Sequence, residues 1–137
     1  MGRIYDLVVV GAGILGLAHA LHAARRGLKV AVLDRDAQAN GASIRNFGFV
    51  TVTGQAAYKT WERARRSRDL WAEVAPLAGI PIHHRGLLMA VRRPEAVSVL
   101  REFLASPMGK ACRLLEGAEI PAPLRNTELL AALHSPH

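Results

Sequence analysis

The sequence has one cysteine and few aromatic residues, and these shortages exclude several kinds of protein. Cys112 is the only cysteine among 137 residues, so no disulfide can form within the chain. A lone cysteine suits a reducing compartment, and we expect a cytoplasmic protein in which Cys112 is a buried, inert thiol. Aromatic residues make up only 5% of the chain. Surfaces that bind single-stranded nucleic acids stack bases on aromatic rings among basic residues, so we expect no nucleic-acid partner.

Acidic residues are also scarce. The chain has 11 Asp and Glu against 18 Lys and Arg, which gives a net charge of +7. The basic residues are scattered, except for a cluster of four arginines, Arg63, Arg65, Arg66 and Arg68. These arginines fall within a stretch of helical periodicity. We therefore interpret the cluster as the solvated face of a helix rather than as a phosphate-binding patch.

No apolar run is long and uninterrupted enough for a membrane span. Leu7–Ala24 approaches the roughly 17–25 residues that a span needs, but three glycines break its first half and two histidines its second. Arg3 and Asp6, which precede the run, do not form the purely basic start of a signal peptide. We expect no integral membrane segment and interpret the run as a strand, a turn and a helix.

The first 34 residues do contain the pattern of a β-α-β unit. Residues 5–10 (YDLVVV) form a nearly continuous apolar run, as in a parallel strand that is covered on both faces. Residues 14–26 are mostly Leu and Ala, which favour a helix, and Gly27 ends it. Residues 29–34 (KVAVLD) predict a second strand, which ends in an acid.

Three glycines between the first strand and the helix follow the pattern G-x-G-x-x-G. Gly11 allows the tight turn, Gly13 lets the backbone approach a pyrophosphate at the helix N-terminus, and Gly16 lets the helix pack closely on the strand. Asp34 follows at about the 20-residue spacing at which an acid meets the ribose hydroxyls of a dinucleotide. The sequence therefore predicts a dinucleotide site. A β-α-β unit without a ligand is the alternative.

The glycine pattern does not by itself distinguish NAD from FAD. Asp34 disfavours NADP because a carboxylate repels a 2′-phosphate, although the neighbouring Arg35 weakens this argument. In a nicotinamide enzyme, a further helix and a third parallel strand usually follow the second strand. Here a polar stretch, residues 35–43, leads instead into IRNFGFV. An NAD-dependent dehydrogenase stays an alternative to an FAD enzyme.

Two segments, VVVGAGILGLAHALHAARRGLKVAVLDRD and GASIRNFGFV, resemble the D-amino-acid oxidase-like superfamily of FAD-dependent amine oxidoreductases, which includes glycine oxidase and sarcosine oxidase. The resemblance implies that FAD is the cofactor and that Ser43 serves its pyrophosphate or ribityl region. It also implies that Arg45, Asn46 and Gly48 lie near the flavin. Capping of the next helix or of a turn is the alternative role of Ser43 and Asn46. The residues that we expect to bind the cofactor are Gly11, Ala12, Gly13, Ile14, Leu15, Gly16, Asp34, Arg35, Ala42, Ser43, Arg45, Asn46 and Gly48.

The resemblance implies a reaction as well. The family oxidises a carbon–nitrogen bond, with a hydride passing from the α-carbon of a small amine or amino acid to the flavin. GASIRNFGFV most resembles a subgroup linked to aminoalkylphosphonates. Family members are longer, so we expect the chain to be the N-terminal part of a larger enzyme, and we assign no catalytic residue. A non-catalytic, nucleotide-binding fragment is the alternative.

We expect an α/β fold, in which a Rossmann-like FAD-binding β-α-β unit is followed by the beginning of an α+β substrate-binding domain. Residues 1–55 would belong to the FAD-binding domain, residues 56–79 to a connecting amphipathic helix, and residues 80–137 to the incomplete substrate-binding domain. Within the last of these, GIPIHHRGLLMAVRR predicts two short strands. Pro94 predicts the start of a helix that runs to about Ala105, because proline is tolerated in the first turn.

The pair His83–His84 does not predict a metal site. Adjacent residues on a strand point to opposite faces of the sheet, so the two rings cannot readily bind one ion together. No cluster of cysteines or carboxylates accompanies them. We expect no metal.

Overall fold

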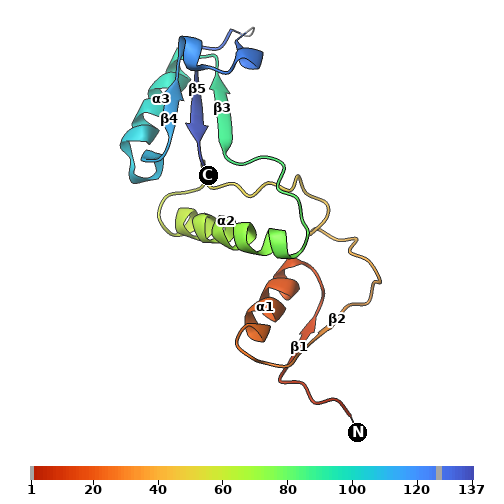
Figure 1. The fold of residues 1–137 in the computed structure, drawn as a ribbon. Helices are drawn as coiled ribbons and strands as arrows, with labels where there is room; N and C mark the ends of the chain where they lie inside the picture. The colour runs from red at the N-terminus through yellow and green to blue at the C-terminus, as the bar shows by residue number, and fades with distance from the viewer. Residues whose placement is uncertain (1, 126–127) are drawn as a thin grey trace. The chain divides into compact units, whose positions relative to one another are not determined.

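The computed structural model describes residues 2–125 and 128–137. The chain divides into two compact units, Met1–Phe49 and Val50–His137, each with its own sheet (Figure 1). None of the helices in the described residues combines the length and the hydrophobicity needed to cross a membrane.

The first unit is the predicted β-α-β unit. Strand β1 (Leu7–Val10) leads through the glycine turn into helix α1 (Ile14–Ala24), and strand β2 (Val30–Leu33) returns parallel to β1. Leu7 lies opposite Val30, and Val10 lies opposite Leu33. The helix ends where the sequence predicts, in a turn at Gly27, whose φ of +83° suits glycine.

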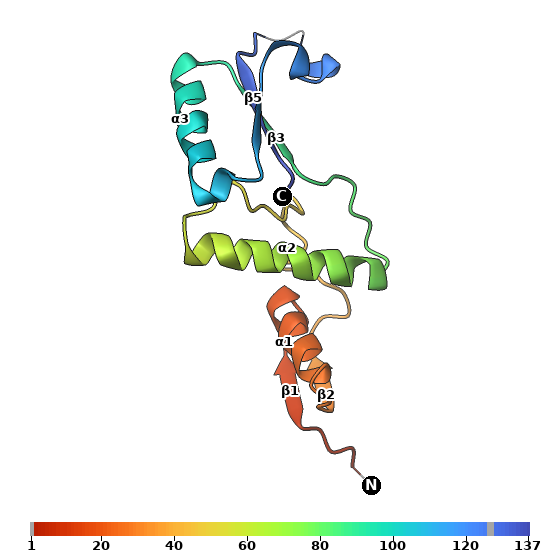
Figure 2. The ribbon, with the colours of Figure 1, turned by 60° about the vertical axis from the view of Figure 1, so that its left-hand side comes forward.

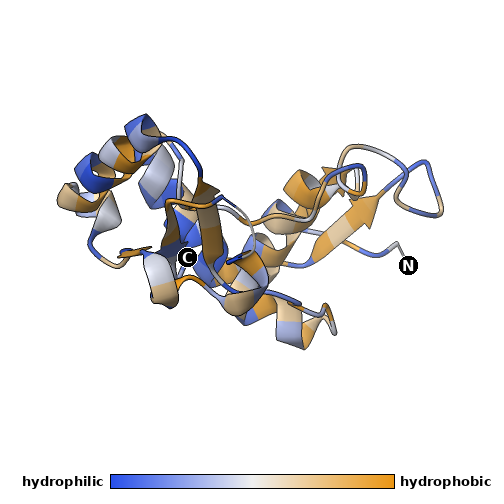
Figure 3. Cartoon of the chain, turned by 90° about the horizontal axis from the view of Figure 1, so that it is seen from above, coloured by the Kyte–Doolittle hydropathy of each residue, from blue (hydrophilic) through white to orange (hydrophobic). Residues whose placement is uncertain are grey.

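Helix α1 covers one face of the two-stranded sheet. Along β1, Leu7 and Val9 are half-buried while Val8 and Val10 are exposed, the alternation expected of a strand with one covered face. Ala20 and Ala23 are the buried residues of α1. Figure 3 shows the strands near the N-terminus in the orange of hydrophobic residues. The sequence predicted strands that are covered on both faces. Helix α1 covers one face, so the apolar residues on the other face of β1 stay exposed.

The second unit begins with helix α2 (Lys59–Leu77), which forms within the predicted connecting helix. Tyr58 precedes it with a φ of +65°, which ends helical geometry on that side. Ala75 is buried, and the two tryptophans at helical spacing, Trp61 and Trp71, are half-buried. Three of the four clustered arginines are exposed, and Arg68 is half-buried against His137.

A three-stranded antiparallel sheet forms the rest of the second unit. Its order is β3 (Leu87–Val91), β5 (Ala131–Ser135) and β4 (Arg113–Leu115), so that β5 is central. Helix α3 (Pro94–Ala105) starts at the predicted proline and runs alongside the sheet (Figure 2). Leu100 of α3, Leu133 of β5 and the expected buried thiol, Cys112, form one core cluster.

The sequence predicted two strands in GIPIHHRGLLMAVRR, but only β3 forms there. Residues 80–86 are not part of a strand. Pro81 has no N–H to donate to a ladder, and Gly86 has a φ of +84°, outside strand geometry. The hydrogen-bonding partner of β3 is instead β5, some 40 residues later in the chain. His83 and His84 therefore do not lie on a strand. Among the described residues, no group of three or more His, Cys, Asp or Glu side chains could hold a metal ion.

Candidate dinucleotide-binding site

A cleft of about 680 Å³ lies in the first unit at the carboxyl ends of β1 and β2. Its walls are the glycine turn, residues 10–13, and the stretch that follows β2, residues 33–43. Ligands of open α/β sheets bind outside the carboxyl ends of the strands, which is where this cleft lies. The volume is in the usual range of small-molecule sites.

The glycine turn is built from close backbone contacts. Gly11 has a φ of +104°, a conformation that side chains disfavour, and its N–H donates to the carbonyl of Leu33 (2.7 Å). A Cβ at Gly16 would stand 1.9 Å from the carbonyl oxygen of Gly11 and 3.2 Å from Cγ1 of Val9. Only a glycine at position 16 therefore lets α1 pack against the turn and β1.

Ser43 lies at the N-terminus of α1. Its Oγ accepts the backbone N–H of Ile14 (2.9 Å), while Gly13, the residue in the N-cap position, has no side chain with which to do so. The predicted alternative was that Ser43 caps the next helix or a turn, whereas the helix that its hydroxyl caps is α1, 29 residues earlier. The N–H groups of a first helical turn attract anions. A hydroxyl that accepts one bond can donate its own hydrogen to such an anion.

Asp34 ties the end of β2 to the glycine turn. Its Oδ2 accepts the N–H of Ala12 (2.6 Å), and its Oδ1 accepts the N–H of Asp36 (3.0 Å). These hydrogen bonds, from Asp36 first and Ala12 second, hold the pKa of the exposed Asp34 carboxyl below its ordinary value of 3.8. The carboxylate is charged at neutral pH. The stabilisation that these hydrogen bonds give the turn is lost as the carboxylate is protonated, when the pH falls from 3.8 through the lowered pKa.

Asn46 holds the loop that presents Ser43. Its Nδ2 donates to the carbonyls of Ala42 (3.2 Å) and Ser43 (2.9 Å), and its Oδ1 accepts the N–H of Gly48 (2.8 Å). This is the turn-forming role that the sequence left open for Asn46. The next aromatic residues, Phe47 and Phe49, are exposed and stack on one another with ring centroids 5.8 Å apart.

The structure brings some of the predicted site residues into the cleft wall and leaves others outside it. The predicted residues in the wall are Gly11, Ala12, Gly13, Asp34, Arg35, Ala42 and Ser43. Those outside the wall are Ile14, Leu15, Gly16, Arg45, Asn46 and Gly48. Residues 36–41 also line the cleft and were not among the predicted residues, nor were Val10 and Leu33 at the strand ends. The signal for residues 36–41 was available, because a polar run directly after β2 must pass the mouth of the site.

Comparison with protein families matches residues 6–137 to the family described as DAO, FAD dependent oxidoreductase. The chain belongs to this family. FAD is therefore the cofactor, as the sequence resemblance predicted. No curated protein sequence matches the chain.

Several solved structures are similar to this chain over nearly its whole length. Glycine oxidase from Bacillus cereus superposes with a TM-score of 0.75 at 22% identity, over 97% of this chain and 39% of its own. L-amino acid deaminase from Proteus vulgaris, without its specific insertion, gives 0.79 at 25% identity, over 99% and 38%. L-proline dehydrogenase from P. horikoshii gives 0.77 at 21% identity, over 99% and 37%. These likenesses confirm the mixed α/β fold. The chain spans less than two fifths of each of these structures.

Proposed function

We propose that the chain is the cofactor-binding part of an FAD-dependent oxidoreductase that oxidises the carbon–nitrogen bond of an amino acid or a small amine. The observation that carries the proposal is the cleft at the carboxyl ends of β1 and β2, where the glycine turn, Asp34 and Ser43 meet. Family membership supplies the cofactor. The names of the solved structures, a glycine oxidase, an L-amino acid deaminase and an L-proline dehydrogenase, favour an amino-acid substrate.

The residues of the cleft fit one end of FAD. A Cβ at Gly13 would stand 3.1 Å from Oγ of Ser43, so the glycine leaves room at the helix N-terminus where a pyrophosphate would lie. Ser43 would hold the pyrophosphate by donating its hydroxyl hydrogen, while its Oγ accepts the N–H of Ile14. The charged Asp34 would accept the ribose hydroxyls through the lone pairs that Ala12 and Asp36 leave unused.

The flavin end of the cofactor would lie near residues outside the cleft wall. We place Arg45, Asn46 and Gly48 near the flavin, as the resemblance implies. The bound flavin would supply the acceptor for a hydride from the substrate α-carbon. An aminoalkylphosphonate as substrate, a cytoplasmic location and the division into residues 1–55, 56–79 and 80–137 stay predictions.

The first test is the identity of the bound cofactor. We expect the full-length protein to purify yellow with non-covalent FAD, which acid precipitation releases into the supernatant. Its absorbance spectrum and mobility against authentic FAD and FMN identify it. A colourless protein that binds NAD in calorimetry would contradict the proposal and favour the dehydrogenase. Anaerobic loss of the flavin absorbance on addition of glycine, L-proline or 2-aminoethylphosphonate then separates an oxidoreductase from a protein that only binds nucleotides.

Replacing Asp34 tests the adenosine end of the site. Asp34→Ala removes a charged acceptor and also releases the N–H of Ala12. We expect the dissociation constant for FAD to rise by roughly ten- to a hundredfold, as measured by flavin fluorescence on adding FAD to the apoprotein. Asp34→Asn, which keeps one acceptor oxygen, should bind with intermediate affinity. An unchanged constant in Asp34→Ala would show that the acid only ends the strand.

A further inference from the structure

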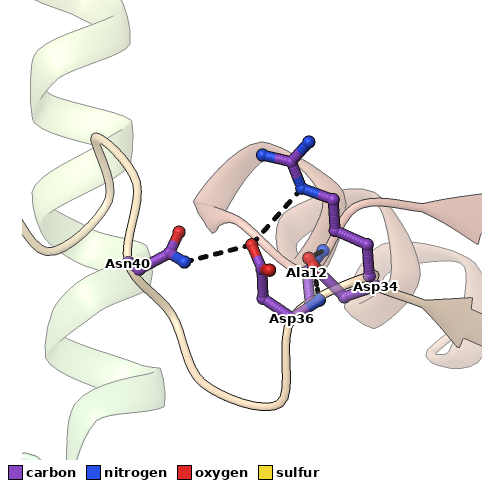
Figure 4. Close-up of polar contacts among 5 residues, drawn as sticks. Ala12, Asp34, Asp36 and Asn40 are labelled. Atoms are coloured by element: carbon purple, nitrogen blue, oxygen red, sulfur yellow. Dashed lines mark hydrogen bonds and ion pairs between the residues drawn. The ribbon is translucent and has the colours of Figure 1, made fainter.

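Asp36 forms hydrogen bonds or an ion pair with three other residues of the cleft wall (Figure 4). Its carboxylate Oδ2 accepts Nδ2 of Asn40 (3.1 Å) and forms an ion pair with Nε of Arg35 (3.4 Å). Its backbone N–H donates to Asp34. Neither Asp36 nor Asn40 is among the residues that the sequence predicted to bind the cofactor.

The partner of Arg35 bears on which nucleotide the cleft accepts. In dinucleotide sites of this architecture, an arginine near the ribose acid accommodates a 2′-phosphate. Arg35 directly follows Asp34, and its side chain is 90% exposed, so by position it could serve such a phosphate. The guanidinium instead contacts the carboxylate of Asp36, and Asn40 donates to the same oxygen, Oδ2.

We propose that Asp36 is a specificity-determining residue that excludes 2′-phosphorylated nucleotides from this cleft. It does so in two ways: it competes with a phosphate for Arg35, and it adds a second negative charge beside Asp34. The mouth of the cleft then carries two carboxylates against one guanidinium. Asn40 is a positioning residue that keeps the Asp36 carboxylate at the rim. The inference rests on the proposed function, in which the adenosine ribose lies at Asp34.

The size of the effect follows from the exposure of these groups. An ion pair between exposed side chains is weak, so most of the discrimination must come from the charge of Asp36 acting on a doubly charged phosphate. Such an interaction through water changes affinity by only a few-fold, and dissolved salt screens it. Dependence on ionic strength is therefore a signature that a merely structural residue would not show.

The experiment compares two probes, ADP-ribose and 2′-phospho-ADP-ribose, as competitors of FAD for the full-length apoprotein. The dissociation constant of 2′-phospho-ADP-ribose divided by that of ADP-ribose measures discrimination against the 2′-phosphate. Asp36→Asn removes the charge but keeps an oxygen that can accept from Asn40. We expect this variant to lower the ratio about threefold at 10 mM salt, and by much less at 0.5 M salt. Adding Arg35→Gln to Asp36→Asn should raise the ratio again, because it removes a positive charge beside the 2′-phosphate and so offsets the lost negative charge.

The matched control is Asp6→Asn, which makes the same change of charge. Asp6 accepts the N–H of Lys29 at the amino ends of the two strands, the opposite end of the sheet from the cleft. A strand of this length places it about 15 Å away, so its charge acts much more weakly on the 2′-phosphate than that of Asp36, and the ratio should change much less at the same salt concentration. An unchanged ratio in Asp36→Asn, or an equal weakening of both probes, would overturn the inference. If unmodified apoprotein binds FAD but neither probe displaces it, the placement of adenosine in this cleft fails first.

Discussion

Alanine in place of Gly16 is expected to abolish FAD retention and to destabilise the first unit by about 3 kcal/mol, the upper end of the usual cost of overpacking. The added Cβ would lie 1.9 Å from the carbonyl oxygen of Gly11 and 3.1 Å from its carbonyl carbon. Both atoms belong to the backbone of the turn, so no side-chain rotation can relieve the contact. Helix α1 must move away from β1, and the turn that would hold the pyrophosphate moves with it.

Gly41→Ala is the matched control for the effect of Gly16→Ala on stability, and it does not control for FAD retention because Gly41 lines the cleft. Gly41 also belongs to the first unit, but a Cβ there meets no atom within 4 Å, and its φ is not in the left-handed region. We expect its thermal unfolding temperature to stay close to that of the unmodified protein. Flavin absorbance relative to protein absorbance, measured after gel filtration, reports retention of FAD. Gly16→Ala protein that keeps stoichiometric FAD and an unchanged unfolding temperature would contradict the packing described for this turn.

The 137-residue chain expressed by itself is expected to aggregate and to bind FAD weakly or not at all. Strands β1 and β2 form a sheet of only two strands, whose parallel pairing normally requires cover on both faces. On the face away from α1, Val8 is 51% and Val10 84% exposed, and Leu33 at the end of β2 is 57% exposed. Exposed apolar patches of this kind drive association, and the unpaired edges of strands add to it.

Substitutions on the two faces of β1 test the cause of this aggregation. Val8→Thr with Val10→Thr makes the exposed face more polar and should increase the fraction of protein that elutes as a monomer. Val9→Thr changes the half-buried side, whose Cγ1 lies near Gly16, and should not. A soluble monomer of the unmodified chain with a cooperative thermal transition and micromolar affinity for FAD would contradict the prediction. It would show that these 137 residues are a self-sufficient domain.

Local patterns in the sequence determined the first unit almost completely. The apolar run before Gly11, the Leu- and Ala-rich stretch after it and the second run ending at Asp34 predicted β1, α1 and β2 in their order. Pro94 likewise marked the first residue of α3. These features could be read because their causes are local: a strand or a helix follows from the spacing of neighbouring residues, and the geometry of a turn follows from the absence of a side chain.

What the tertiary structure alone decided are contacts between residues far apart in the chain. The family resemblance predicted that Ser43 serves the cofactor, but the sequence could not show that its hydroxyl caps α1. It gave no sign that Asp36 engages Arg35 and Asn40, or that β5 would lie between β3 and β4 in place of the predicted second strand. Each of these depends on where the backbone carries a side chain or strand after several turns. No periodicity encodes such a position, because it is fixed by the packing of the whole unit.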